Sequence, residues 1–242
     1  MRQLGFVAAL PDEARSLTGQ RPGFGDLLQM PGGHWLAVSG AGAENARLAA
    51  ARLLEQGVAG LVSWGCAAAL DPALQPGDLV LPEHILGADR TAVETDAAWR
   101  GRFAQALDGK LALFSGFLAE SPLIVASVTA KWTLHQATGA IAVDMESAAV
   151  ARLAQANGLP FLAARAIADT SAMQMPAAVM AALNPRGDVR LGGLLAYTLR
   201  HPGQVAELIH LGRAFGSAMA TLRTAKSLAG ADFCFPPPPE PR

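Results

Sequence analysis

Acidic residues stand at the ends of two apolar segments in the second half of this chain. Glu146 follows the apolar run that begins at Ala142, and Asp169 follows the run that begins at Ala164. Glu13 adds a third acidic residue, directly after the apolar N-terminal segment. A carboxylate in such a run is costly unless a ligand or a protein donor satisfies it. The three residues together predict a polar site built around a small ligand.

The composition narrows the class of protein. The chain has 242 residues, of which 51% are hydrophobic and 16% charged, so one α/β domain or two small ones with a large core are expected. A net charge of −1 offers no basic excess for nucleic-acid binding, and this class is excluded. Cys66 and Cys234 are too few for a disulfide framework or a zinc cluster, which favours a reducing cytoplasm. Residues 57–70 form the longest charge-free apolar stretch, and a membrane span needs about 20 residues.

The elements that must position the carboxylates alternate between strand and helix. Apolar runs predict strands at residues 4–10, 34–39, 58–64, 79–81, 110–115, 123–127, 141–145 and 160–167. Helical spacing predicts helices at residues 12–17, 43–56, 130–138 and 147–157, and three further helices at 177–183, 191–200 and 204–228. This alternation indicates an α/β fold with a parallel or mixed sheet.

Several short motifs carry a family resemblance through their order and spacing. They are residues 5–13, 40–42, 62–68, 76–78, 143–146 and 165–169. As an ordered set, these motifs resemble the superfamily of nucleoside phosphorylases and methylthioadenosine/adenosylhomocysteine nucleosidases, over residues 4–170. Residues 144–147, 159–161 and 199–204 resemble the branch associated with hopanoid biosynthesis, which is understood to remove adenine from adenosylhopane.

The resemblance implies a three-layer fold, in which helices flank a central mixed sheet and extra helices follow at the C-terminus. Residues 1–175 would form the catalytic core, and residues 176–230 would form a helical extension of the same domain. Residues 231–242 would form a Pro-rich, disordered tail.

By resemblance, Asp169 and Glu13 are the catalytic residues. Asp169 would protonate purine N7 as the N-glycosidic bond stretches, which requires a raised pKa. Glu13 would activate water and stabilise the cationic sugar. The structural alternatives are a helix N-cap for Asp169 and a solvated first-turn position for Glu13.

Other residues would bind the substrate. Glu146 would accept both ribose hydroxyls, with Met145 beneath the sugar, or alternatively would satisfy a helix N-terminus. Cys66 would lie beside the attacking water or phosphate, where Gly65 and Ala67 allow backbone amides to approach an anion. A small buried hydrophobic role is the alternative for Cys66.

Weaker assignments complete the expected site. Gly42 belongs to a small turn that would approach the sugar pocket, and Val128 and Thr129 would lie near the purine. Trp132 is assigned to the core, with stacking on the base as the alternative. Arg165, inside a predicted strand, is expected to pair with a carboxylate near the site.

The resulting hypothesis is cleavage of the N-glycosidic bond of a 5′-substituted adenosine, with adenosylhopane as the expected substrate. Hydrolysis is favoured because Ser63 stands where trimeric phosphorylases carry an arginine, which leaves Arg15 and Arg47 as candidate phosphate ligands. The alternatives are a phosphate-dependent salvage phosphorylase and a non-catalytic nucleoside-binding protein. No cofactor is expected, with phosphate as co-substrate in the alternative, and the five scattered histidines predict no metal site.

The helices after Pro176 combine apolar residues with interspersed arginines. They could cover the core, line a channel for the 5′ group, or lie on an anionic membrane surface. A cytoplasmic homo-oligomer is expected, and peripheral membrane contact is the alternative suggested by these helices.

Overall fold

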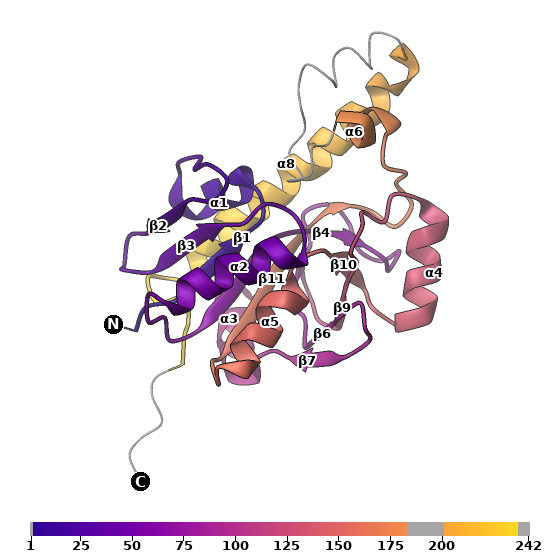
Figure 1. Cartoon of the computed structure of the whole chain (residues 1–242). Coiled ribbons are helices and arrows are strands. Elements are labelled where there is room, and N and C mark those ends of the chain that lie inside the picture. The colour runs from indigo at the N-terminus through magenta and orange to yellow at the C-terminus, as the bar shows by residue number, and fades with distance from the viewer. Residues whose placement is uncertain (1, 183–200, 237–242) are drawn as a thin grey trace.

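The computed structural model describes residues 2–182 and 201–236, which form a mixed sheet flanked by helices (Figure 1). The strands are β1 (Gly5–Ala8), β2 (Leu27–Gln29), β3 (Trp35–Val38), β4 (Leu61–Ala69), β5 (Leu79–Val80), β6 (His84–Leu86), β7 (Ala92–Glu94), β8 (Leu113–Phe114), β9 (Phe117–Glu120), β10 (Ala142–Asp144) and β11 (Phe161–Asp169). The helices are α1 (Pro11–Thr18), α2 (Ala43–Leu54), α3 (Ala97–Leu107), α4 (Val128–Thr138), α5 (Ser147–Ala156), α6 (Ala177–Ala182) and α8 (Val205–Leu228), with a 3₁₀ turn η1 (Pro202–Gln204) before α8.

Strand β4 joins the two parts of the sheet. It runs parallel to β1 and β11, and its last residues pair antiparallel with β10. The sheet order is β2-β3-β1-β4-β10-β9-β6-β7, while β11 branches from β4 and leads through β5 to β8. The register between β11 and β4 shifts between Ile167 and Asp169, and such an irregularity can re-aim a side chain at a strand end.

Helices cover both faces of the sheet and bury two apolar clusters. On one face, α2 and α5 contribute alanines such as Ala46 and Ala148, which let these helices lie close to the strands. On the other face, α1, α3 and α8 surround Trp64, whose indole N–H donates to Ser16 Oγ at 2.8 Å. The core therefore fixes α1 and α8 against the same strands that end at the acidic residues.

The α/β fold with a mixed sheet and flanking helices is confirmed, and one predicted strand is wrong. Residues 123–127 form a loop rather than a strand, while β9 lies just before them and was not predicted. The apolar run at 123–127 forms part of a cavity wall instead of a strand ladder. The helix expected at 191–200 lies outside the described residues, and the boundary at residue 176 stays a prediction.

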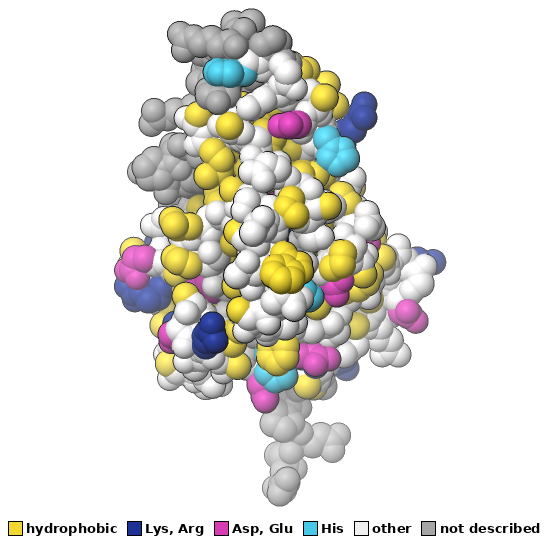
Figure 2. Space-filling view, turned by 90° about the vertical axis from the view of Figure 1, so that its right-hand side faces the viewer, with side chains coloured by type: hydrophobic (Ala, Val, Ile, Leu, Met, Phe, Trp, Pro, Cys, Tyr) yellow, Lys and Arg dark blue, Asp and Glu magenta, His cyan; other side chains and the backbone are white. Residues whose placement is uncertain are grey.

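Among the described residues, no helix is both long enough and apolar enough to span a membrane. The face that α4 covers nevertheless carries many hydrophobic side chains (Figure 2). On α4 itself, Val128 is 42% exposed and Trp132 is 63% exposed, so the assignment of Trp132 to the core is wrong. The helix is turned so that Lys131, the neighbour of Trp132, is the buried residue.

The first part of the expected C-terminal tail packs into the core. Phe233 and Phe235 are buried, and the ring of Phe233 lies 4.5 Å from that of Phe6 and 6.2 Å from that of Trp64. The indole N–H of Trp99 donates to the carbonyl oxygen of Phe233 at 2.8 Å. Residues 231–236 thus close one end of the core, and residues 237–242 lie outside the described part of the chain.

We therefore expect Phe233→Ala to lower the free energy of unfolding by about 3–5 kcal/mol, because it removes a buried ring from an aromatic cluster. Phe117→Ala is the matched control, since Phe117 is 40% exposed and its truncation leaves no closed cavity. Urea denaturation measures both. Equal losses for the two variants would contradict the assignment of Phe233 to the core.

Candidate active site

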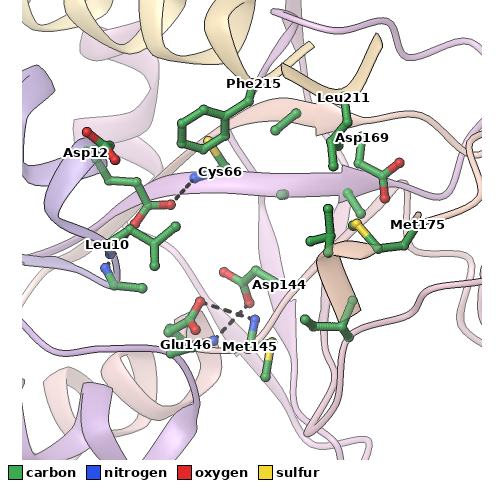
Figure 3. A pocket seen from close by; sticks show the side chains of 18 of the residues that line it. Leu10, Asp12, Cys66, Asp144, Met145, Glu146, Asp169, Met175, Leu211 and Phe215 are labelled. Atoms are coloured by element: carbon green, nitrogen blue, oxygen red, sulfur yellow. Dashed lines mark hydrogen bonds between the residues drawn. The ribbon is translucent and has the colours of Figure 1, made fainter. Parts of the chain in front are cut away.

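A cavity of about 1010 Å³ opens where α1, β4, β10, β11 and α8 meet. Carboxyl groups and apolar side chains both line it, and Figure 3 shows Asp144 and Glu146 on one side and Asp169 on the side of Leu211 and Met175. The apolar residues come from the 123–125 loop, from the segment after β11 and from α8, and they are Leu123, Ile124, Val125, Met175, Val179, Leu208, Leu211 and Phe215. Figure 3 places Leu211 and Phe215 on the opposite side of the cavity from Met145 and Glu146.

Glu13 is fixed by backbone donors from two elements. Pro11 starts α1 and places Glu13 in the first turn, where Oε2 accepts from the backbone N–H groups of Leu10 at 2.9 Å and Ala9 at 3.0 Å. Oε1 accepts from the N–H of Cys66 on β4 at 2.8 Å. Burial raises the pKa of Glu13, and the positive charge of Arg165 and the three N–H groups oppose this rise.

Gly65 allows this approach of α1 to β4. A Cβ at position 65 would lie 2.5 Å from Glu13 Oε1 and 2.6 Å from Arg165 Nη1, which real Cβ atoms do not tolerate. The predicted role of Gly65 was to let backbone amides approach an anion. In the structure the neighbouring amide of Cys66 is already bound to Glu13.

The guanidinium group of Arg165, on β11, is buried next to the carboxylates that line the cavity. Its Nε contacts Asp144 Oδ2 at 2.8 Å, and its Nη2 donates to Ser63 Oγ at 2.6 Å and Ser147 Oγ at 3.0 Å. The predicted pairing of Arg165 with a carboxylate near the site is therefore confirmed. Asp144, which also accepts a short hydrogen bond from the Ser147 hydroxyl, was not among the predicted site residues.

Glu146 lies between the end of β10 and the start of α5. Its Oε1 accepts from the N–H of Gly42 at 2.8 Å, so the small turn before α2 touches the site through its backbone. Burial and the nearby Asp144 carboxylate raise the pKa of Glu146 to about 7, although Arg165 and the Gly42 N–H act in the opposite direction. Glu146 is thus a buried carboxyl that only partly ionises at neutral pH.

Asp169 ends β11 and pairs with a lysine that sequence reasoning missed. Lys131 Nζ lies 2.6 Å from Asp169 Oδ2, and the lysine side chain is completely buried. Oδ1 of Asp169 is buried and has no hydrogen-bond partner among the described residues. Burial raises the pKa of Asp169, and the Lys131 ammonium opposes this rise.

The remaining predicted residues divide into two groups. Met145, Cys66 and Ala67 line the cavity together with Glu13, Glu146 and Asp169. Val128 and Thr129 do not line it: they begin α4, and Val128 borders a separate hollow of about 280 Å³ that Trp132 also lines. The wall of the large cavity next to α4 is therefore formed by residues 123–125 rather than by the first turn of α4.

Charge and ligand chemistry limit what the cavity can hold. Among the described residues, the cationic side chains that line it are Arg15 and Arg21, both exposed, and Arg21 is paired with Asp12 at 3.1 Å. Arg47, the other predicted phosphate ligand, pairs with Glu44 at 2.7 Å on the surface. Within residues 2–182 and 201–236, no group of three or more His, Cys, Asp or Glu side chains could hold a metal ion.

Comparison with known proteins places this arrangement in context. The sequence model of the phosphorylase superfamily matches residues 32–184, while no curated protein sequence matches the chain significantly. The 5′-methylthioadenosine/S-adenosylhomocysteine nucleosidase of Neisseria meningitidis superposes with a TM-score of 0.71 at 18% identity, covering 97% of this chain and 100% of that chain. Futalosine hydrolase of Helicobacter pylori superposes with a TM-score of 0.68 at 16% identity, covering 95% and 96%.

At these identities the solved structures establish a shared fold, and the family match extends over more than half of the sequence. The fold and the sequence match therefore indicate the same family, and the cavity with carboxylates at strand ends is the candidate active site. The chain belongs to the phosphorylase superfamily and is an enzyme of this superfamily.

Proposed function

We propose that this enzyme hydrolyses the N-glycosidic bond of a 5′-substituted adenosine with a bulky apolar 5′ group and releases adenine. The observation that carries the proposal is a single cavity that is lined both by the carboxyl groups of Glu13, Glu146 and Asp169 and by apolar residues of α8. Its volume of about 1010 Å³ reaches the upper end of typical ligand sites, which exceeds what an unsubstituted nucleoside fills. Adenosylhopane, which the sequence resemblance suggests, has such an apolar group.

Structures with the same fold support a 5′-substituted ligand. The Neisseria meningitidis nucleosidase was solved in complex with methylthio-immucillin-A, and the Helicobacter pylori nucleosidase with butyl-thio-DADMe-Immucillin-A. The Helicobacter pylori structure superposes with a TM-score of 0.66 at 18% identity, covering 93% of this chain and 97% of that chain. In this chain, the wall formed by Leu208, Leu211 and Phe215 is the natural place for an apolar 5′ substituent.

Each of three carboxyl groups has its own role in the proposed reaction. Glu146, once ionised, accepts hydrogen bonds from the two ribose hydroxyls and holds the sugar above Met145. As the bond between C1′ and N9 breaks, its electron pair moves to the purine, and Asp169 delivers a proton to N7. Glu13 stabilises the cationic sugar and accepts a proton from the water that attacks C1′.

The surroundings of Glu13 favour water over phosphate as the nucleophile of the proposed reaction. Oε2 already accepts two hydrogen bonds and Oε1 accepts one, so Oε1 retains a lone pair for a water molecule. The backbone N–H of Cys66 already donates to Glu13, so it is not available to a phosphate dianion. The Glu13 carboxylate also lies where such a dianion would need hydrogen-bond donors. Burial raises the pKa of the Cys66 thiol well above its usual value, so this residue does not supply a thiolate nucleophile.

Assembly and membrane contact stay predictions. Exposed apolar side chains at Leu123, Trp132 and Ile209 are compatible with the expected homo-oligomer, and they equally suit contact with a lipid surface. Light scattering of the purified protein, followed by flotation with anionic vesicles, separates these two expectations.

The nucleophile is tested by product analysis. In phosphate-free buffer with 5′-methylthioadenosine or adenosylhopane in detergent, we expect adenine and a free ribosyl product by mass spectrometry. Glu13→Gln should lower kcat by about 100- to 10,000-fold, the range of general acid–base catalysis. The matched control is Glu44→Gln on the surface. Adenine release that requires phosphate and yields a ribose 1-phosphate would contradict hydrolysis.

The titration of Glu146 predicts a pH dependence. Because its pKa in the folded protein is about 7 against 4.5 ordinarily, kcat/KM should fall as the pH drops below about 7 and the carboxyl loses its capacity to accept both hydroxyls. The folded state binds the proton more tightly than the unfolded state, so Glu146 reduces stability as the pH rises from 4.5 to 7.

Glu146→Gln isolates this effect. The free energy of unfolding of the variant relative to wild type should increase between pH 4.5 and 7 and remain level above pH 7, while ribose binding is lost. Urea denaturation across this pH range measures the difference. A difference that does not change with pH would show that Glu146 titrates normally.

The apolar wall predicts a preference for longer 5′ groups. Across 5′-alkylthio adenosines, kcat/KM should rise up to about fourfold for each buried methylene, which corresponds to about 0.8 kcal/mol. Phe215→Asn should flatten this dependence and leave 5′-methylthioadenosine little affected. Equal kcat/KM values along the series in wild type would remove the support for a bulky apolar substituent.

A further inference from the structure

Lys131 is a buried lysine whose position is determined by the candidate acid and by the segment that follows it. Its Nζ lies 2.6 Å from Asp169 Oδ2, 2.7 Å from the carbonyl oxygen of Thr170 and 2.8 Å from that of Met173. An ammonium group has three N–H donors, and here each has one acceptor. The side chain is completely buried and does not itself line the cavity.

The two oxygens of Asp169 therefore differ. Oδ2 is engaged by Lys131, while Oδ1 is buried without a partner among the described residues. A proton on Oδ2 would face an ammonium that has no lone pair to accept it, whereas a proton on Oδ1 would meet no competing donor. Asp169 lines the cavity, but Oδ1 is buried, so a purine in the cavity would engage this unpartnered oxygen after a small rotation of the carboxyl group.

We propose that Lys131 is the positioning residue for Asp169, since it directs the carboxyl proton to Oδ1 and stabilises the carboxylate that remains after this proton has left. The inference rests on the proposed function. In the bond-breaking step the Oδ1–H proton passes to purine N7, while the electron pair of the broken C1′–N9 bond moves to the purine. Glu13 takes one proton from the attacking water, and exchange with solvent returns both carboxyl groups to their starting states.

The lysine affects the transition state more than the ground state. A neutral carboxyl interacts weakly with an ammonium 2.6 Å away, and a carboxylate interacts strongly with it. Negative charge develops on Asp169 as the proton moves, so the contact strengthens along the reaction. Burial, which raises the pKa of Asp169, and the Lys131 ammonium, which lowers it, thus act in opposite directions on the same group.

Other charged groups near the pair lie on several elements. The remaining titratable groups around the cavity are Asp12, Glu13 and Arg15 on α1, Arg21 after it, Cys66 on β4, and Asp144 and Glu146 at the β10–α5 junction, with Arg165 of β11 buried beneath them. Among the described residues, Lys131 is the one that forms an ion pair with Asp169.

The first test measures Asp169 without any substrate. In protein labelled with ¹³C-aspartate, the Cγ signal of Asp169, assigned by its loss in Asp169→Asn, is titrated with pH. Lys131→Met should move the midpoint to higher pH, because the ammonium that favours the carboxylate is gone. Lys110→Met, the same change at an exposed lysine, should leave it in place. An unchanged midpoint in Lys131→Met would overturn the inference, whether or not the protein has the proposed activity.

The second test uses turnover of 5′-methylthioadenosine. In Lys131→Met the basic limb of the kcat profile should move to higher pH, and the plateau should fall about 10- to 100-fold, less than the full contribution of a general acid. With 4-nitrophenyl riboside, whose leaving group needs no proton, Lys131→Met should retain nearly wild-type turnover. Equal losses on both substrates would indicate a merely structural lysine and overturn the inference.

A third variant guards against misfolding. If Lys131→Met does not fold, Lys131→Gln replaces the ammonium by a neutral polar group that is one bond shorter and can still donate N–H hydrogen bonds, and the same two measurements decide. Absence of adenine release by the wild-type protein would refute the proposed function, while the aspartate titration would still decide the coupling of Lys131 to Asp169.

Discussion

The buried guanidinium of Arg165 is the interaction on which the architecture of the site depends. It projects from the middle of β11 and contacts Asp144, Ser63 and Ser147, which belong to the β10–α5 region and to β4. A buried cation without such partners would be prohibitively unfavourable, so the three elements must meet at one place. Gly65 then provides the room that lets Glu13 approach from α1 without a steric clash.

Buried acids outnumber buried bases around this centre. Among the described residues, five acidic side chains are buried against one lysine and one arginine. Arg165 and Lys131 each form a close ion pair with one carboxylate, whereas Glu146 lies 3.9 Å from Arg165 Nη2 and Glu13 is bound by backbone N–H groups; both glutamates have raised pKa values. A ligand with hydroxyl groups near Glu146, and a water molecule near Glu13, would supply further hydrogen-bond donors to these two carboxyl groups.

The sequence revealed more of the acidic part of the site than of its surroundings. Glu13, Glu146 and Asp169 could be predicted because each follows an apolar run, and the ends of neighbouring strands meet at one edge of a sheet. Lys131 left no comparable signal, because a single lysine on a helix is usually solvated and its partner lies 38 positions away. Trp132 was misassigned since its residue type suggests burial, whereas the turn of α4 is set by the buried ion pair next to it.

The apolar part of the cavity was equally hard to foresee, because one helix serves two purposes. The C-terminal half of α8 places Ala218 and Leu222 in the core, whereas its N-terminal half contributes Leu208 and Leu211 to the cavity wall. Hydrophobic spacing alone does not separate these halves, since both present apolar residues to the rest of the protein. The arrangement has a consequence for specificity. The core half anchors the helix, so substitutions in the wall half can change the shape of the cavity without disturbing the carboxylates, which are held by other elements.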